Sequence, residues 1–255
     1  MKRVLTALLL IPFVVWVVLW AGDWIFLGVL ALAACLSYRE YDVIAGGYGF
    51  GRPGVLGYGA GLCLLAWWDA TWLILVMVAL AALVMVMRAP DLATALPRAA
   101  LLVTGVVYIF GCWKCARPLH EVNPYWLLYA LMLNWIGDTG AYVVGRAFGK
   151  HRLAPRVSPN KTWEGAIASV LVAVGAGVLY LWRFIPTVPL EAAIPLTAAA
   201  NIAGQFGDLA ESAMKRGANV KDSGGLLPGH GGFLDRVDST LFALPIVWAW
   251  VSFRG

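Results

Sequence analysis

The sequence predicts an all-α protein, a polytopic transmembrane helical bundle of about nine spans with its N-terminus in the cytoplasm. Composition is the first of three observations behind this prediction. Of 255 residues, 61% are hydrophobic and 13% are charged, and the mean hydropathy is +0.78. Soluble domains carry roughly 25% charged residues, and a soluble globule could not bury this much apolar surface. The composition excludes an ordinary cytosolic enzyme, a disordered chain and a secreted disulfide scaffold.

Charge-free runs of at least 15 residues are the second observation, and they define the expected helices. The nine runs are residues 4–22, 24–38, 53–68, 70–87, 99–113, 122–137, 165–182, 192–207 and 239–253. A bilayer core of ~30 Å needs about 20 helical residues, so the shorter runs must include flanking residues or tilt little. Barrel strands would alternate polar and apolar residues, and these runs do not.

The distribution of basic residues is the third observation. With the N-terminus inside, 15 of the 19 Lys and Arg residues fall in cytoplasmic segments, as the positive-inside rule expects. Membrane topology therefore explains the net charge of +5, and nucleic acid is not an expected partner. We expect one integral membrane domain over residues 1–255, with an apolar helical bundle over 1–120 and a catalytic region over 134–239.

Residues 138–165 form the first break in the apolar pattern. Asp138 lies where an apolar run would otherwise continue, and a carboxylate at membrane depth costs about 2.5–3.5 kcal/mol unless it faces a cavity or a partner. A basic segment follows, in which Ser158, Asn160 or Thr162 could cap the next helix. A helix N-terminus beside Lys161 would be a favourable binding site for phosphate.

Residues 208–239 form the second break, with five acids and four bases within 208–238. On a helix, one face would hold Asp208, Glu211, Ser212 and Lys215, and another would hold Asp235, Asp238 and Ser239. Carboxylates at such spacing repel each other. A bound divalent cation would offset the repulsion, and hard oxygen ligands suit Mg²⁺.

A glycine-rich loop separates these two helical pieces. Five of the ten residues in 223–232 are glycine, so the backbone can bring N–H groups close to an anion. The loop is not a Walker A motif. His230 within it is either a structural residue or a substrate contact. Carboxylates, bases and a glycine loop describe a phosphate-handling site, and at the inner membrane surface its substrates would be a soluble nucleotide and a phospholipid.

Five ordered motifs resemble the signature of the phosphatidate cytidylyltransferases, or CDP-diacylglycerol synthases. They are Asp-Thr-Gly-Ala-Tyr at 138–142, Ser-Pro-Asn-Lys-Thr-Trp-Glu-Gly at 158–165, Ser-Ala-Met-Lys-Arg at 212–216, Lys-Asp at 221–222, and Leu-Pro-Gly-His-Gly-Gly-Phe-Leu-Asp-Arg-Val-Asp-Ser at 227–239. The resemblance covers about residues 134–239. The first ~120 residues match only in forming apolar helices, which is weak support.

The resemblance implies that CTP and phosphatidic acid react to give CDP-diacylglycerol and pyrophosphate for phospholipid biosynthesis. The enzyme would be a nucleotidyltransferase of the bacterial cytoplasmic (inner) membrane, with its active site facing the cytoplasm. The lipid phosphate would attack the α-phosphorus of CTP, and no strong general base is needed because a phosphomonoester is ionised near pH 7. Mg²⁺, with K⁺ as a candidate second ion, and a homodimer are also implied.

The resemblance and the residue pattern together give three groups of candidate site residues. The metal ligands are Asp208, Asp235, Asp238 and, as a weaker fourth, Asp222. The catalytic group is Lys215, Arg216, Lys221, Asp222, His230 and Arg236. The substrate-binding group is Asp138, Ser158, Asn160, Lys161, Ser212, Gly229, Gly231 and Gly232. Asp138 could contact either a metal or a base.

Two alternative functions remain open at this point. A CTP-dependent lipid kinase with a similar site would release CDP instead of pyrophosphate. An ion-coupled secondary transporter could use Asp138 and Asp208 as a relay, with the glycine-rich stretch as a broken helix. The transporter hypothesis predicts a related acidic segment, interrupted by Gly or Pro, in the other half of the chain, and we expect none in the first 120 residues.

Overall fold

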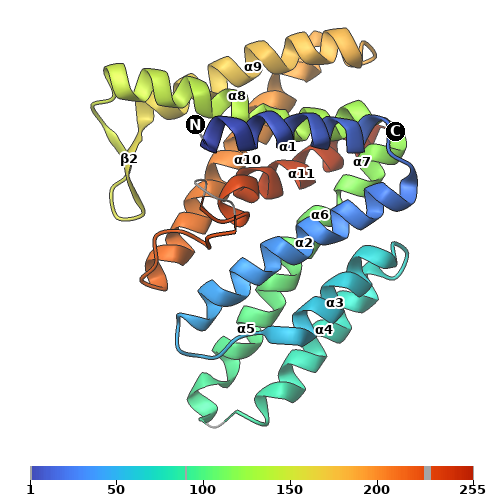
Figure 1. Cartoon of the computed structure of the whole chain (residues 1–255), viewed down its shortest axis with the longest axis vertical. Helices are drawn as coiled ribbons and strands as arrows, with labels where there is room; N and C mark the ends of the chain where they lie inside the picture. The colour runs from blue at the N-terminus through green and yellow to red at the C-terminus, as the bar shows by residue number, and fades with distance from the viewer. Residues whose placement is uncertain (1, 90, 227–230, 255) are drawn as a thin grey trace. The chain divides into compact units, whose positions relative to one another are not determined.

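The computed structural model describes residues 2–89, 91–226 and 231–254. Helices make up nearly all of the regular structure in these residues (Figure 1). The chain forms two compact units. The first comprises Met1–Leu8, Gly22–Lys114 and Met214–Val237, and the second comprises Leu9–Ala21, Cys115–Ala213 and Asp238–Gly255.

The first unit packs its helices around aromatic rings. Its main helices are α2 (Asp23–Gly46), α3 (Gly54–Ala66), α4 (Thr71–Val86) and α5 (Ala95–Gly105). A short 3-10 helix, η1 (Leu92–Thr94), precedes α5, and a π-helical segment, η2 (Val106–Gly111), and α6 (Cys112–Lys114) follow it. A Cβ atom on Gly57 would overlap the ring of Tyr38, and one on Gly61 would overlap that of Phe110. Both rings are fully buried, so two glycines of α3 make room for the centre of this core.

The second unit is built on an antiparallel helix pair. Its elements are α7 (Ala116–Val122), α8 (Pro124–Phe148), α9 (Trp163–Phe184), most of α1 (Lys2–Leu19), and the larger parts of α10 (Leu190–Gly217) and α11 (Leu234–Arg254). Gly145 of α8 lies against Gly165 of α9, and Leu133 lies against Gly177, so the two helices run in opposite directions. Asn123 begins α8 by accepting a 3.0 Å hydrogen bond from the Tyr125 amide, as a typical N-cap does.

Small and polar side chains hold α8, α9 and α10 close together. The Ser169 hydroxyl donates to Asn201 Oδ1 over 3.2 Å, and Gln205 Nε2 donates to the same oxygen over 2.9 Å. Gly137 of α8 faces Asn201 and Ser169 so closely that a Cβ atom there could not fit. Helices in membranes commonly associate through small residues and polar contacts of this kind. The arrangement fixes the part of α10 that precedes Asp208.

Four helical segments of the described residues are long and apolar enough to cross a membrane. They are Asp23–Gly46, Leu92–Val122, Pro124–Phe148 and Trp163–Phe184. Leu9–Leu19, Gly54–Ala66 and Thr71–Val86 are apolar but shorter. Every charge-free run expected to span the bilayer lies largely within a helix, which confirms the prediction of an all-α membrane protein. The number of nine spans and the orientation of the N-terminus stay predictions.

A β-hairpin between α8 and α9 was not predicted from the sequence. Strands β1 (Arg152–Ala154) and β2 (Ser158–Thr162) pair antiparallel, with Arg152 opposite Thr162 and Ala154 opposite Ser158. The Thr162 hydroxyl then accepts a 3.2 Å hydrogen bond from the Gly165 amide and caps α9. Of the three candidate caps, Thr162 is therefore the cap. The hairpin holds Lys161 on a strand immediately before α9.

Candidate active site

The second unit pairs a lysine of the hairpin with an aspartate of α10. Lys161 Nζ forms an ion pair with Asp208 Oδ2, and the two side chains are 28% and 31% exposed. The Ser212 hydroxyl, one turn further along α10, donates to Asp208 Oδ1 over 3.4 Å. Because both charged groups keep partial access to solvent, an incoming cation or anion can compete for them.

The same unit contains a close crossing of α10 and α11. A Cβ atom on Gly207 would lie 2.5 Å from the backbone oxygen of Asp238 and 3.0 Å from the Phe242 ring. Only glycine therefore allows the two backbones to approach so closely. Asp208 follows Gly207 directly, so Asp208 and Asp238 both lie at the crossing. The Asp238 side chain is 6% exposed, and its Oδ1 accepts a 2.6 Å hydrogen bond from the Ser239 amide.

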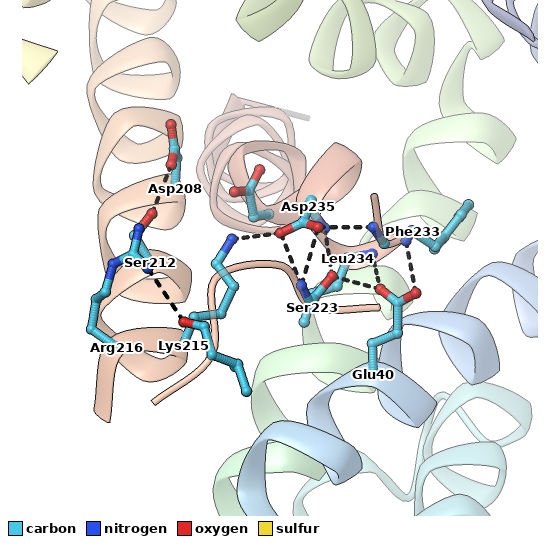
Figure 2. A network of polar contacts seen from close by, with 12 residues as sticks. Glu40, Asp208, Ser212, Lys215, Arg216, Ser223, Phe233, Leu234 and Asp235 are labelled. Atoms are coloured by element: carbon cyan, nitrogen blue, oxygen red, sulfur yellow. Dashed lines mark hydrogen bonds and ion pairs between the residues drawn. The ribbon is translucent and has the colours of Figure 1, made fainter. Parts of the chain in front are cut away.

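The first unit contains a second pair of lysine and aspartate (Figure 2). Lys215 Nζ lies 2.5 Å from Asp235 Oδ1, with side chains 11% and 10% exposed. Asp235 Oδ2 also accepts hydrogen bonds from the backbone amides of Gly232, at 2.8 Å, and Ser223, at 3.2 Å. These contacts tie the end of α10 and both ends of the glycine loop to the first turn of α11. Asp238 follows one turn later on that helix.

Glu40 of α2 is a member of this network that sequence reasoning missed. Its carboxylate is buried at 5% exposure. It accepts hydrogen bonds from the Ser223 hydroxyl at 2.8 Å, the Phe233 amide at 2.9 Å and the Leu234 amide at 2.7 Å (Figure 2). Leu234 begins α11, so Glu40 supplies a negative charge and acceptors at the N-terminus of that helix, where both are favourable.

Two glycines of the loop make room for the Glu40 carboxylate. A Cβ atom on Gly224 would lie 2.6 Å from Glu40 Oε1, and one on Gly232 would overlap Glu40 Oε2 and the Ser223 hydroxyl. Gly231 has φ of +81°, a left-handed conformation that glycine adopts without strain. The glycine content of the described part of the loop is thus explained by close packing around two carboxylates as well as by expected contact with an anion.

Several of the predicted site residues lie in these two clusters. Lys161, Asp208, Ser212 and Asp238 belong to the second unit, and Lys215, Gly231, Gly232 and Asp235 to the first. The expectation that Asp208, Ser212 and Lys215 share a helix is confirmed by α10, and the same expectation for Asp235 and Asp238 is confirmed by α11.

Other candidates lie on exposed surface or outside the described residues. Asp138 on α8, Asn160 on β2, Arg216 at the end of α10, Lys221 and Asp222 before the loop, and Arg236 on α11 are exposed. Ser158 on β2 is half-buried. Gly229 and His230 lie outside the described residues. Of the exposed residues, Arg216 donates a 3.4 Å hydrogen bond to the backbone oxygen of Val220. This bond holds the Arg216 side chain at the turn after α10.

Two of the candidate metal ligands, Asp208 and Asp235, form ion pairs with lysines. Within the described ranges, no group of three or more His, Cys, Asp and Glu side chains is arranged to hold a metal ion. Asp208 instead faces Lys161, and Asp235 faces Lys215. Each lysine ammonium neutralises a carboxylate whose hard oxygen atoms also suit a divalent cation.

The first half of the chain does contain an acidic segment followed by glycines, contrary to the expectation stated for the transporter hypothesis. Glu40 and Asp42 on α2 are followed by residues 46–54, in which five of nine residues are glycine. Both carboxylates cap helices: Glu40 caps α11, and Asp42 Oδ1 accepts a 2.7 Å hydrogen bond from Gly54 at the start of α3. These contacts are structural and give no sign of an ion relay.

The fold and the site define a class of protein: an all-α membrane protein with aspartates on two helices that cross at a glycine, and with lysines paired to two of those aspartates. Such groups are suited to bind phosphates together with a cation. The chain belongs to the cytidylyltransferase family, whose model matches residues 1–254.

Curated relatives agree with this family. A phosphatidate cytidylyltransferase from Bacillus subtilis (strain 168) is 41% identical over 146 residues, which cover 56% of this chain and 54% of the relative. One from Staphylococcus haemolyticus (strain JCSC1435) is 45% identical over 123 residues, covering 48% and 47%. One from Staphylococcus aureus (strain COL) is 42% identical over 145 residues, covering 56% and 53%. The chain thus spans about half the length of the curated relatives that it matches.

Proposed function

We propose that this protein transfers a cytidylyl group from CTP to phosphatidic acid, giving CDP-diacylglycerol and pyrophosphate. Membership of the cytidylyltransferase family supports the type of reaction, and the names of the relatives support the lipid substrate. The structural observation that carries the proposal is the pairing of Lys161 with Asp208 in the second unit and of Lys215 with Asp235 in the first. Lysines and carboxylates together provide positions for phosphates and for a cation.

We propose Mg²⁺ as the cofactor, because the candidate ligands are carboxylates. Asp208, Asp235 and Asp238 would hold the ion, with Asp222 as a further candidate and K⁺ as a candidate second ion. Their oxygen atoms are hard ligands, and a lysine ammonium already neutralises two of the three carboxylates. When bound, Mg²⁺ would neutralise the charge that develops on the phosphates during transfer.

The two lysines have a further role once a cation lies among the carboxylates. Lys161 and Lys215 would then be available to the phosphates of CTP, since a cation can replace an ammonium as the partner of an aspartate. Lysine binds phosphate as a point charge that can move on a flexible stem.

The chemistry of the transfer balances without a protein base. A phosphate oxygen of phosphatidic acid attacks the α-phosphorus of CTP and forms a new P–O bond. The bond from the α-phosphorus to the bridging oxygen breaks, and pyrophosphate leaves with the electron pair. The attacking phosphomonoester is already largely ionised near pH 7. The protein therefore contributes positioning and charge neutralisation, which dominate catalysis of phosphoryl-type transfer.

The setting of the reaction is also part of the proposal. We place the protein in the bacterial cytoplasmic membrane with the site facing the cytoplasm, where CTP is available. The skew of basic residues toward the predicted inner segments supports this orientation, and the apolar helices support the bilayer as partner. A homodimer is the proposed assembly.

One assay tests the reaction and separates it from the two alternatives. Purified protein in detergent is given CTP, Mg²⁺ and dioctanoyl phosphatidic acid, and the products are measured. The proposal predicts stoichiometric pyrophosphate and CDP-diacylglycerol. Release of CDP would identify a lipid kinase. The absence of any CTP-dependent product would contradict both the cytidylyltransferase and the lipid kinase hypotheses. Asp69→Asn serves as a matched control for aspartate variants of the site, because Asp69 is exposed between α3 and α4.

A further inference from the structure

A small pocket in the first unit combines two arginines with apolar walls. Its volume is about 90 Å³, and it lies between the loop that precedes α3, the end of α4 and the start of α5. The charged residues that line it are Arg52 and Arg98. Phe50, Met85, Val86 and Leu102 are among its apolar lining residues. None of these residues belongs to the candidate active site.

One buried atom of the pocket is left without a partner by the described residues of the protein. Arg98 Nε is buried and has no hydrogen-bond partner. Within the described residues, neither Arg52 nor Arg98 forms an ion pair with a carboxylate. Arg52 is exposed and Arg98 is half-buried, so the remaining guanidinium atoms can reach solvent. Buried polar atoms in folded proteins nearly always have partners, so the buried Nε of Arg98 marks a position where the pocket can receive an acceptor from outside the chain.

Two glycines lie against the arginine side chains of the pocket. A Cβ atom on Gly46 would lie 2.8 Å from Arg52 Cγ, so glycine there leaves room for the arginine stem. Gly51 has φ of +89°, and a Cβ atom on it would lie 3.7 Å from the Arg98 guanidinium carbon. The hydrogen bond from Gly54 to Asp42 fixes the far end of the loop. The general preference for basic residues on the inner side explains the charges, but it does not explain why two guanidinium groups share one pocket.

The chemistry of the pocket selects a phosphate. Guanidinium groups bind phosphate oxygens through paired, charge-assisted hydrogen bonds. Arg98 lies near the start of α5. A volume of about 90 Å³ is too small for a nucleotide, because drug-sized ligands occupy roughly 300–1,000 Å³. A single phosphate group is the appropriate size.

We propose that Arg52 and Arg98 bind the phosphate of an anionic phospholipid at this pocket. A lipid is favoured over free phosphate because α4 beside the pocket presents apolar side chains outward: Leu83, Val84 and Met85 are 51%, 63% and 40% exposed. Basic pockets between membrane helices are typical sites for lipid head groups. The acyl chains would lie along this apolar surface. The proposal does not depend on the reaction assigned to the active site.

Native mass spectrometry tests this site by measuring how dioctanoyl phosphatidylglycerol binds to the full chain in nonionic detergent. This probe carries an anionic phosphate but is not the proposed substrate. Arg52→Gln and Arg98→Gln should each weaken binding by about tenfold or more, because each removes charge-assisted hydrogen bonds. Arg88→Gln is the matched control: it removes the same charge from an exposed position after α4 that does not line the pocket.

Further variants keep the test decisive if a glutamine variant fails to fold. Arg52→Lys and Arg98→Lys retain the charge but lose the planar fork, so they should fold and still bind more weakly than wild type. Equal affinity in the wild type and in all four pocket variants would overturn the proposal. If inorganic phosphate displaces the lipid at equal concentration, the ligand is free phosphate and the proposal of a lipid ligand is overturned. Failure of inorganic phosphate to compete would support it.

Discussion

Replacement of Glu40 by glutamine should weaken the first turn of α11. The Glu40 carboxylate is 5% exposed, and Oε1 and Oε2 accept from the Phe233 and Leu234 amides respectively. Glutamine has one acceptor oxygen, so its amide NH₂ must face one of these N–H groups. We expect the loss of one charge-assisted hydrogen bond, about 1.5–3 kcal/mol, and of a charge at a helix N-terminus, about 0.3–1 kcal/mol. The free energy of unfolding should fall by about 2–4 kcal/mol.

Thermal unfolding of the detergent-solubilised protein measures this change. At roughly 2–4 °C per kcal/mol for a chain of this size, the midpoint should fall by about 4–16 °C. Amide hydrogen exchange should rise at residues 232–235, because those amides lose their acceptors. Activity should fall mainly in kcat, since Asp235 lies next to Leu234 and would lose its fixed position while substrate contacts remain.

Glu121→Gln is the control for Glu40→Gln. Glu121 forms an ion pair with Arg117 at 2.7 Å, one helical turn away, and its side chain is 57% exposed. Exposed pairs contribute about 0–1 kcal/mol, so this variant should unfold close to the wild-type temperature. If Glu40→Gln and Glu121→Gln shift the midpoint equally, the role assigned to Glu40 is refuted.

Three further predictions concern the two clusters. Asp238→Asn should lower turnover by at least about 100-fold while the protein stays folded, because the amide keeps an acceptor for Ser239 but loses the charge. Near-normal pyrophosphate release would remove Asp238 from the metal ligands. Lys161→Gln should raise the KM for CTP by about tenfold, which corresponds to about 1.4 kcal/mol, and an unchanged KM with reduced kcat would contradict a role in phosphate binding. Gly224→Ala should destabilise the protein by about 1–3 kcal/mol, since its Cβ would meet Glu40 at 2.6 Å. Gly225→Ala, with nothing within 4 Å, should leave the unfolding temperature unchanged, and equal effects of the two would contradict the packing argument.

The sequence predicts the helices well because hydropathy alone determines where a chain can cross a bilayer. The polar ends of α10 and α11 follow from a second signal, because Asp208 with Ser212 and Asp235 with Asp238 have helical spacing. The β1–β2 hairpin escaped this approach. Its strands are three and five residues long, and their basic side chains give no alternation of apolar residues to recognise.

Glu40 shows why part of the site could not be predicted. Its partners Phe233 and Leu234 lie 193 and 194 positions further along the chain. From the sequence alone, a glutamate between Arg39 and Tyr41 near the predicted inner end of a helix fits an exposed interfacial residue. Two signals could have drawn attention to it: the carboxylates at 40 and 42, and the glycine-rich segment at 46–54 that follows them. Neither signal indicates that Glu40 contacts Phe233 and Leu234.

The contact between Glu40 and α11 also has a consequence for biosynthesis. The ribosome must add 194 residues after Glu40 before Leu234 exists. At roughly 5–20 residues per second this takes about 10–40 s. During translation, α2 is made long before the amides that its buried carboxylate will accept. The candidate active site can therefore mature only after α11 has been made, and a nascent chain that stops before α11 leaves Glu40 without these partners.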